Sequence, residues 1–229
     1  MRHNAKKRNR NRRLRARHFR RKSCVKRKCD KFQKAKQIIL DLIYGKKVAI
    51  IGNAESFYTK DWSETLKEYD VIVRINAGIC LTEEQKAKTT DRCDIYFDRY
   101  EAEYASKIDE INSCKEPKII VLNIPRIYKT NDPRIFYFSR EFIKKTRSAI
   151  NGAPPTMGLR VFMLLCDIGS FSELALFGFD FFETPDFYDG KTHILEDRNI
   201  IHNPKEEKTY ILSKIEKDVR LKWYPPNET

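Results

Sequence analysis

A short apolar run that stops at a glycine constrains the fold of this chain more than any other feature. Val48 to Ile51 are apolar and mostly β-branched, and Gly52 and Asn53 follow them directly. A run of this length with a glycine stop predicts a buried strand rather than a piece of helix. In open α/β sheets such a strand end presents backbone N–H groups to a phosphate or nucleotide, and a glycine lets the ligand approach closely. An ordinary strand-to-loop exit is the alternative interpretation, and neither G-x-G-x-x-G nor a P-loop motif is present.

Strand-like and helix-like segments alternate along the rest of the chain. Strands are expected at residues 48–51, 71–75, 93–97, 118–124, 174–179 and 219–224. Helices are expected at residues 31–44, 62–69, 101–113, 136–147, 159–168 and 206–216. This alternation predicts a single Rossmann-like α/β domain whose mainly parallel sheet is flanked by helices. The ligand of such a sheet lies beyond the carboxyl ends of its strands, where Gly52-Asn53, Asn76 to Gly78 and the loop at 154–158 would gather.

The positive charge of the chain is concentrated at its N-terminus. Residues 1–36 hold 18 Lys or Arg and one acid, whereas residues 37–229 hold 28 Lys or Arg and 31 acids. We therefore expect a basic arm over 1–36, partly disordered or helical, followed by a domain over 37–229. The arm would attract anionic lipid or nucleic acid, unless it is only a solubilising tail. Nucleic acid is the less favoured partner, because Phe19 is the only aromatic residue before Phe32.

Composition narrows the class of protein further. A chain of 229 residues with 41% hydrophobic and 34% charged residues is typical of a globular protein. No stretch approaches the roughly 20 apolar residues of a membrane helix. No apolar run follows the N-terminal charges, so no secretory signal is expected. The six cysteines lack C-x-x-C spacing, which argues against a structural zinc site and favours free thiols in a reducing cytoplasm.

Several short stretches carry the main functional signal when they are taken in chain order. They are V-A-I-I-G-N at 48–53, D-V-I-V-R-I-N-A-G at 70–78, K-T-T-D-R at 88–92, P-T-M-G-L at 155–159, L-C-D at 165–167, L-F-G-F-D at 176–180, H-I-L-E at 193–196 and H-N-P-K-E-E at 202–207. Their order and approximate spacing resemble the sialylmotifs of glycosyltransferase family 29. The resemblance extends over about residues 46 to 225.

This resemblance implies a GT-A-like sialyltransferase fold and a reaction. The expected enzyme is inverting and metal-independent, and moves sialic acid, or a related ulosonic acid such as Kdo, from a CMP-sugar to a glycan or glycolipid hydroxyl. No cofactor is expected beyond the CMP-sugar, which is a substrate. The chain also shows no convincing Asp-x-Asp metal pair, since Asp180 is expected to end a strand.

The resemblance also implies a donor-binding site. The amides of Asn53 and Asn76 would hold the ribose and phosphate of the cytidine nucleotide. Thr156 and Gly158, at the start of a helix, would meet anionic groups of the donor through N–H groups, a hydroxyl and the helix dipole. The complete set of expected donor-binding residues is Gly52, Asn53, Ser56, Asn76, Thr156, Met157 and Gly158.

Two histidines are the expected catalytic residues on the same ground. His202 would act as general base, because imidazole titrates near neutral pH and can accept a proton from a sugar hydroxyl. His193 would stabilise the negative charge that develops on the departing phosphate. Glu207 would orient its helix or the His202 ring. The expected supporting residues are Arg74, Glu196 and Glu207.

Some positions depart from the family pattern. Val48 stands where vertebrate members have a cysteine that pairs with the counterpart of Cys166, so that disulfide cannot form. This fits a cytoplasmic protein, peripheral at the inner membrane surface through residues 1–36. Met157 replaces a threonine and Asp91 replaces a histidine, which leaves the donor contacts there open. The chain is also short, which resembles a compact microbial or viral-type member.

Two other classes of function stay open at this point. One is a nucleic-acid-associated protein whose basic arm does the main work. The other is a non-catalytic module that binds CMP. The presence of both His193 and His202 at their expected places argues against each of them.

Overall fold

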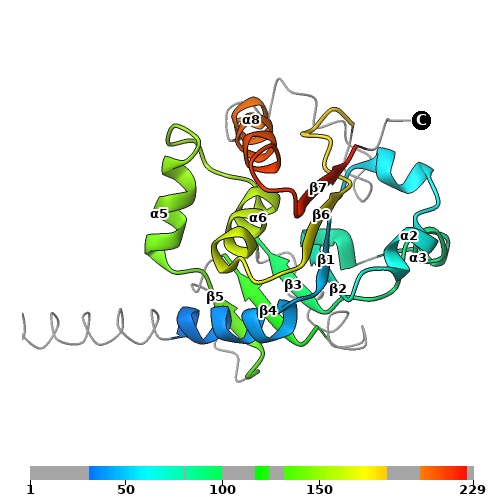
Figure 1. Cartoon of the computed structure of the whole chain (residues 1–229), viewed down its shortest axis with the longest axis horizontal. Coiled ribbons are helices and arrows are strands. Elements are labelled where there is room, and N and C mark those ends of the chain that lie inside the picture. The colour runs from blue at the N-terminus through cyan, green and yellow to red at the C-terminus, as the bar shows by residue number, and fades with distance from the viewer. Residues whose placement is uncertain (1–30, 80, 100–116, 124–131, 185–201, 226–229) are drawn as a thin grey trace, which may run out of the picture.

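The computed structural model describes residues 31–79, 81–99, 117–123, 132–184 and 202–225 (Figure 1). Within these residues, seven strands form one sheet in the order β5-β4-β3-β2-β1-β6-β7. Every neighbouring pair of strands runs parallel. The strands are β1 (Lys47–Ile51), β2 (Val71–Ile75), β3 (Ile95–Asp98), β4 (Ile119–Leu122), β5 (Ile135–Tyr137), β6 (Glu173–Phe177) and β7 (Leu221–Tyr224). The prediction of a single α/β domain with a parallel sheet is confirmed.

The helices of the described part lie on both faces of this sheet (Figure 1). The labelled α-helices are α2 (Ser63–Lys67), α3 (Glu83–Lys88), α5 (Arg140–Ser148), α6 (Met157–Ile168) and α8 (Pro204–Ile215), and a further helix is described over residues 31–43. Two 3-10 helices, η1 (Glu55–Thr59) and η2 (Asn76–Ile79), directly follow strand ends in the sequence. Most boundaries agree with the expected ones to within a few residues.

The hydrophobic core lies in two layers, one against each face of the sheet. Val48 and Ile50 face a large cluster that includes residues of the 31–43 helix, α5, α6 and α8. Ala49 and Ile51 face the opposite cluster, which includes Phe57 of η1 and residues of α2. Since both faces are covered, β1 reads in sequence as an unbroken apolar run rather than an alternating one.

One expected helix was placed wrongly at its start. We expected residues 136–147 to be helical, but Phe136 lies in the edge strand β5, and the helix begins only at Arg140. Ser139 separates the two elements, because its side chain accepts a hydrogen bond from Phe142 N and caps α5. The short strand and the helix are so close in sequence that the pattern of apolar residues could not separate them.

The helix over residues 31–43 belongs to the packed core. Phe32 and Ala35, which the expected arm included, are 3% and 0% exposed. The Phe32 ring packs against Phe138 and Phe142, with centroid separations of 6.0 and 5.5 Å. The packed part of the chain therefore includes residues at least as early as Phe32. Residues 1–30 of the arm, like the helix expected at 101–113, lie outside the described residues.

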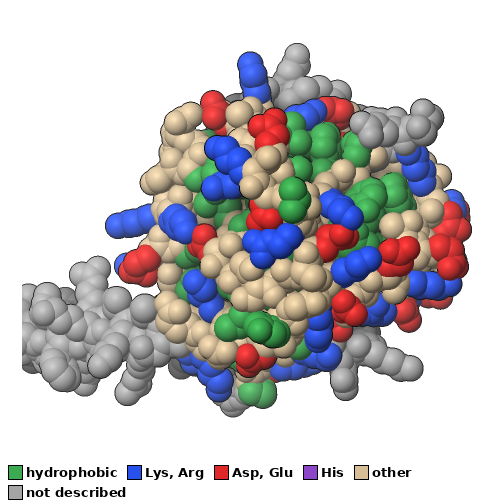
Figure 2. Space-filling model, viewed as in Figure 1, with side chains coloured by type: hydrophobic (Ala, Val, Ile, Leu, Met, Phe, Trp, Pro, Cys, Tyr) green, Lys and Arg blue, Asp and Glu red, His purple; other side chains and the backbone are tan. Residues whose placement is uncertain are grey.

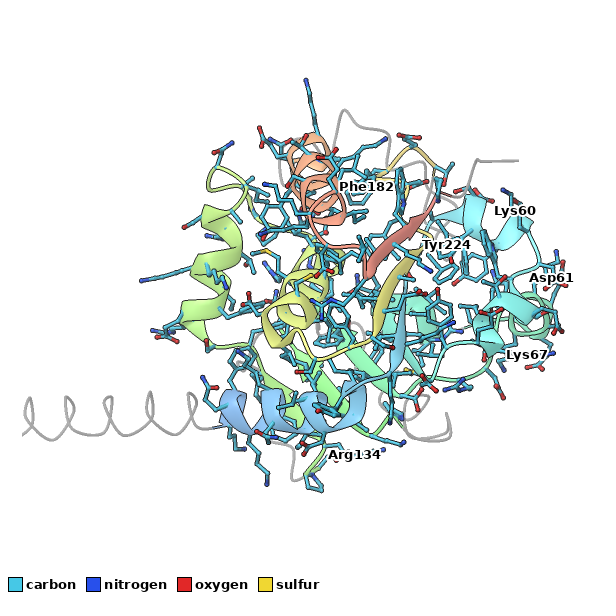
Figure 3. The ribbon with its side chains drawn as sticks, viewed as in Figure 1. Lys60, Asp61, Lys67, Arg134, Phe182 and Tyr224 are labelled. Carbon is cyan, nitrogen blue, oxygen red and sulfur yellow. The ribbon has the colours of Figure 1, made fainter. Side chains whose placement is uncertain are left out.

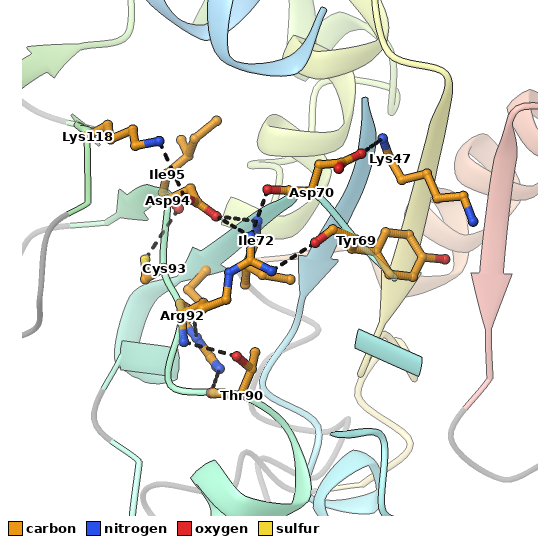
Figure 4. Close-up of polar contacts among 11 residues, drawn as sticks. Lys47, Tyr69, Asp70, Ile72, Thr90, Arg92, Cys93, Asp94, Ile95 and Lys118 are labelled. Atoms are coloured by element: carbon orange, nitrogen blue, oxygen red, sulfur yellow. Dashed lines mark hydrogen bonds and ion pairs between the residues drawn. The ribbon is translucent and has the colours of Figure 1, made fainter. Parts of the chain in front are cut away.

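A polar network ties strand starts together at the amino edge of the sheet (Figure 4). Asp94 accepts a hydrogen bond from Ile72 N at 2.9 Å and forms an ion pair with Arg92 at 3.3 Å. Arg92 also donates to the carbonyls of Tyr69 and Asp70. Because this network lies before β2 and β3, it fixes the edge opposite to the one where a ligand would bind.

The charges of the described surface are mixed. On the face drawn in Figure 2, lysine and arginine side chains lie among aspartates and glutamates rather than in one patch. Among the described residues, no helix combines the length and the apolar composition that crossing a bilayer requires. The two described cysteines, Cys93 and Cys166, are free thiols.

Candidate functional site

The order of the strands reverses between β1 and β6. From β1 the chain builds outward through β2 to β5, and it then returns to place β6 on the other side of β1. Gly52 follows β1 and Gly178 follows β6, and the two segments are joined by Gly52 N donating to Phe177 O at 2.7 Å. Open α/β sheets bind their ligands at such a reversal, beyond the carboxyl ends of the strands. Gly52 and Asn53, which follow β1, therefore lie at this reversal, and their role as a binding site stays a prediction.

The glycines of the site make room for protein rather than for a ligand. A Cβ at Gly52 would lie 2.2 Å from the Gly178 carbonyl oxygen and 3.1 Å from the Phe179 ring. A Cβ at Gly158 would lie 2.6 Å from the same ring. The Phe179 ring is thus wedged between the loop after β1 and the start of α6. The close approach that we expected of a ligand at Gly52 is made instead by the loop after β6.

Asn53 is buried at the end of β1 with an unused acceptor. Its side chain is 7% exposed, and its Oδ1 accepts no hydrogen bond from any described residue. A Cβ at Gly78 would lie 2.8 Å from this oxygen, so η2 passes directly beside it. Buried polar atoms normally have partners, and an exception of this kind at a strand end points to a ligand contact.

Asn76 is held in place at the end of β2. Its backbone is left-handed, with φ of 47°, and its carbonyl accepts a hydrogen bond from Tyr96 Oη at 2.7 Å. Its side-chain Oδ1 accepts from Arg99 N at 3.1 Å, which leaves the amide NH₂ group as the donor that a ligand would meet. Asn53 thus follows β1 and Asn76 follows β2 as the first residue of η2, which passes beside Asn53.

The buried Arg74 side chain binds backbone carbonyls of η2 and of the segment before β3. Its side chain is 1% exposed, and it donates to the carbonyls of Gly78, Thr90 and Arg92. These three bonds fasten η2 to the segment that leads into β3. The supporting role expected for Arg74 therefore has a geometric basis.

Ser56 is engaged by the loop after β6. Its hydroxyl lies 3.5 Å from Asp180 Oδ2 and 3.2 Å from Thr184 Oγ1. Asp180 is 6% exposed and accepts hydrogen bonds from Phe182 N, Thr184 N and the Thr184 hydroxyl. The Asp180 side chain therefore closes the turn after β6. Ser56 joins η1 to this turn, so a donor contact by its hydroxyl would have to compete with these bonds.

Thr156 and Glu207 form the most complete polar contact of the site. Thr156 is the N-cap of α6, since its side chain accepts from Leu159 N at 3.1 Å. Its backbone N–H donates to Glu207 Oε1 at 2.7 Å and its hydroxyl donates to Oε2 at 2.5 Å. Because Thr156 gives both donors to Glu207, an anion at this helix start would meet the N–H groups of Met157 and Gly158 instead.

The burial of Glu207 changes its acidity. The residue is 3% exposed, and burial raises its pKa to about 7, against the opposing effects of the Thr156 hydrogen bonds and the Arg160 charge. Glu207 holds the N-cap of α6 through its two bonds to Thr156, whereas we expected it to orient its own helix or the His202 ring.

His202 lies just before α8 and faces the same loop. Its Nδ1 is 2.7 Å from the Pro154 carbonyl oxygen. A carbonyl oxygen only accepts, so Nδ1 carries the proton and, in the neutral ring, Nε2 carries the lone pair. The His202 ring is nearly parallel to that of Phe182, at a centroid separation of 6.3 Å. Phe182 is labelled in Figure 3. The last motif thus clamps the 154–158 loop twice, through His202 and through Glu207.

Two expected site residues, His193 and Glu196, lie outside the described residues. No group of three His, Cys, Asp or Glu side chains that would suit a metal ion occurs in the part of the chain that the structure describes. The independence of metal implied by the resemblance stays a prediction.

The sequence analysis overlooked two residues of this region. Phe179, in the L-F-G-F-D stretch, was treated as part of a strand, although it follows β6 and wedges between two glycines. Arg160 was not singled out, although it is the only charged residue between Met157 and Cys166 and is 7% exposed. A lone arginine inside an apolar helical run was the signal that could have identified it.

No family model matches this chain, and no curated protein matches its sequence. Solved structures of mammalian sialyltransferases are among those that resemble its fold. A mammalian sialyltransferase in complex with Gal-β-1,3-GalNAc-ortho-nitrophenol matches with a TM-score of 0.55 and 14% identity, over 81% of this chain and 71% of that chain. A further crystal structure of a mammalian sialyltransferase matches with a TM-score of 0.54 and 14% identity, over 79% of this chain and 69% of that chain. The chain therefore has a sialyltransferase-like α/β fold.

Proposed function

We propose that this chain is an inverting, metal-independent glycosyltransferase that uses a CMP-sugar. It would move sialic acid, or a related ulosonic acid such as Kdo, to a hydroxyl of a glycan or glycolipid. The proposal includes the sialylmotif assignments and a place among compact microbial or viral-type sialyltransferases. It also includes a cytoplasmic location at the inner membrane surface. It draws on the likeness of the fold to sialyltransferases, one of which is bound to a glycoside.

The observation that carries the proposal is the orientation of His202. Donation from Nδ1 to the Pro154 carbonyl fixes the ring against the loop that leads into α6 and leaves Nε2 as the basic atom. Glu207 binds the same loop at Thr156, so the base and the start of α6 are tied to one segment. A positioned imidazole of this kind is the group that a hydroxyl nucleophile requires.

In the proposed reaction, the acceptor hydroxyl attacks the anomeric carbon of the donor sugar. The new carbon–oxygen bond forms as the bond from that carbon to the phosphate oxygen breaks, and CMP leaves. The hydroxyl proton passes to Nε2 of His202. Asn53, Asn76 and the N–H groups at the start of α6 would hold the nucleotide, and His193 would stabilise the negative charge on the leaving phosphate.

The test replaces the base while keeping its structural contact. In His202→Asn, the amide nitrogen can still donate to the Pro154 carbonyl, but the side chain has no basic lone pair. We expect sugar transfer from CMP-sialic acid or CMP-Kdo, measured with EDTA and a mixed pool of glycan acceptors, to fall roughly 10²- to 10⁴-fold. CMP affinity and the urea midpoint should stay close to those of the wild type.

His18→Asn, in the basic segment, is the matched control and should keep full activity. Activity retained by His202→Asn would show that the ring only holds the 154–158 loop in place, and that His202 is not the general base. Binding of CMP without any transfer by the wild type would favour the non-catalytic CMP module instead.

A further inference from the structure

Arg160 is a buried cation in an apolar helix. It lies one turn into α6, where its backbone N–H donates to Thr156 O at 3.2 Å. The residues around it in sequence, from Leu159 to Leu165, are otherwise apolar and buried. Arginine is rarely buried to this extent, 7% exposed, unless an anion pairs with it.

No described residue supplies that anion. The Nε atom of Arg160 makes no hydrogen bond, and no ion pair joins its guanidinium to a described carboxylate. Among the described acids, Glu207 is the one whose charge acts on Arg160, but both Glu207 oxygens are bound by Thr156. The other charges that act on Arg160 are those of Arg147 and Arg99, which are also positive.

The result is a positive charge on Arg160 whose Nε has no hydrogen-bond partner among the described residues. Burial, followed by the charge of Arg147, lowers the pKa of Arg160 to about 10, so the guanidinium remains charged at neutral pH. A buried charge without a partner destabilises the folded state, and a bound anion would relieve that cost.

Arg160 also connects the two halves of the candidate site. On one side its charge acts on Glu207, which holds the N-cap of α6. On the other side it acts on Arg99, whose backbone N–H holds the Asn76 side chain. Arg160 lies in the first turn of α6, close in sequence to the N-cap, and α6 packs against β3.

We propose that Arg160 binds an oxyanion of the sugar-nucleotide donor, either its phosphate or the carboxylate of its ulosonic acid. The inference rests on the proposed function, and it adds a binding residue that lies outside the motif positions assigned above. The planar guanidinium suits both groups, since each can accept two parallel charge-assisted hydrogen bonds. Arg99 and Arg147 would add attraction at longer range.

The test measures equilibrium affinity without an acceptor, for CMP and for CMP-sialic acid. The proteins are the wild type, Arg160→Met and Arg160→Lys, with Arg140→Met as the control because Arg140 is exposed at the start of α5. We expect Arg160→Met to bind CMP-sialic acid roughly 10- to 100-fold more weakly. Arg160→Lys should lie between, and Arg140→Met should match the wild type.

The two ligands distinguish the source of the anion. An equal loss for CMP and CMP-sialic acid assigns the phosphate, and a loss confined to CMP-sialic acid assigns the carboxylate. Without ligand, we expect the Tm of Arg160→Met to equal or exceed that of the wild type, since no pairing partner is lost. Unchanged affinity of Arg160→Met for both ligands would overturn the assignment. A Tm of Arg160→Met low enough that partial unfolding explains its weaker binding would also overturn it. A wild type that binds neither ligand would reject the proposed function and this inference with it.

Discussion

At the scale of single residues, Glu207 both holds the N-cap of α6 and makes the stability of the fold depend on pH. It is buried, it holds both donors of Thr156, and its pKa is raised to about 7 by burial. The carboxyl group in an unfolded chain has a pKa near 4.5. Between these two values the folded protein keeps a proton that the unfolded chain has released, so folding becomes less favourable as the pH rises.

We expect Glu207→Gln to remove most of this pH dependence. In the wild type, the free energy of unfolding should fall between about pH 4.5 and 7 by up to about 3 kcal/mol from this group alone. Glutamine has no titrating proton and can still accept from Thr156 N. Urea unfolding at pH 5.5, 6.5 and 7.5 measures the difference between the two proteins.

Glu216→Gln is the matched control, because Glu216 follows the same helix but is exposed. It should keep the wild-type slope of stability against pH. A wild type and a Glu207→Gln variant with parallel slopes would show that Glu207 is ionised throughout this range, and would contradict the raised pKa.

At the scale of elements, Phe179 joins the loop after β6 to α6 and to the loop after β1. The two glycines that receive its ring differ in what else they touch. The three atoms nearest to a Cβ at Gly158 all belong to the Phe179 ring, whereas a Cβ at Gly52 also meets the carbonyl oxygen of Gly178. A side chain can be shortened by mutation, but a backbone carbonyl cannot.

We therefore expect two glycine substitutions to respond differently to the Phe179→Ala background. Gly158→Ala should cost about 1–3 kcal/mol of stability by overpacking in the wild type, and clearly less once the ring is removed. Gly52→Ala should remain destabilising in both backgrounds, because its Cβ would still meet the Gly178 oxygen. Urea midpoints of the wild type, the three single variants and the two double variants measure both couplings. If Phe179→Ala reduces the destabilisation equally at Gly158 and Gly52, the different contacts inferred for the two glycines are wrong.

The elements themselves were largely predictable from the sequence. Runs such as Val48 to Ile51 are apolar, mostly β-branched and followed by a glycine, so their strands were placed correctly. The edge strand β5 was missed because three residues and a neighbouring helix leave no separate pattern. The capping box that opens α3, Thr82 with Gln85, was present in the sequence but was not used.

The contacts within the site were less predictable than its position. Asn53 and Thr156 could be placed at strand and helix ends, but Thr156 meets Glu207 across 51 residues of chain. The Arg160 environment likewise depends on Arg99, Arg147 and Glu207, which only the fold brings together. Local patterns fix where elements end, whereas pairings between distant side chains follow from tertiary packing.

At the scale of the whole molecule, we expect the basic N-terminal segment to bind anionic surfaces and the domain after it to carry the catalytic activity. Residues 1–30 hold 15 Lys or Arg, and the domain that follows is nearly balanced in charge. We expect removal of residues 1–30 to abolish binding to vesicles that contain anionic lipid, because each basic residue near such a surface contributes roughly 1 kcal/mol. CMP release from a soluble donor should be unchanged. Cosedimentation at low and high salt measures the first effect.

Neutral vesicles are the control and should bind neither protein. Loss of RNA binding in the truncated chain, with anionic vesicle binding unaffected, would favour nucleic acid as the partner of the basic segment. Vesicle binding retained after truncation would place the membrane contact in the domain.

The central claim concerns CMP-sugar transfer with inversion. The most direct measurement is an NMR time course of CMP-sialic acid and CMP-Kdo with purified protein, EDTA and a pool of glycan acceptors. The account predicts that one donor is consumed, that CMP and a new glycoside appear in equal amounts, and that the first glycoside formed has the opposite anomeric configuration to the donor. Retention of configuration, or donors that persist unchanged with the protein, would contradict it.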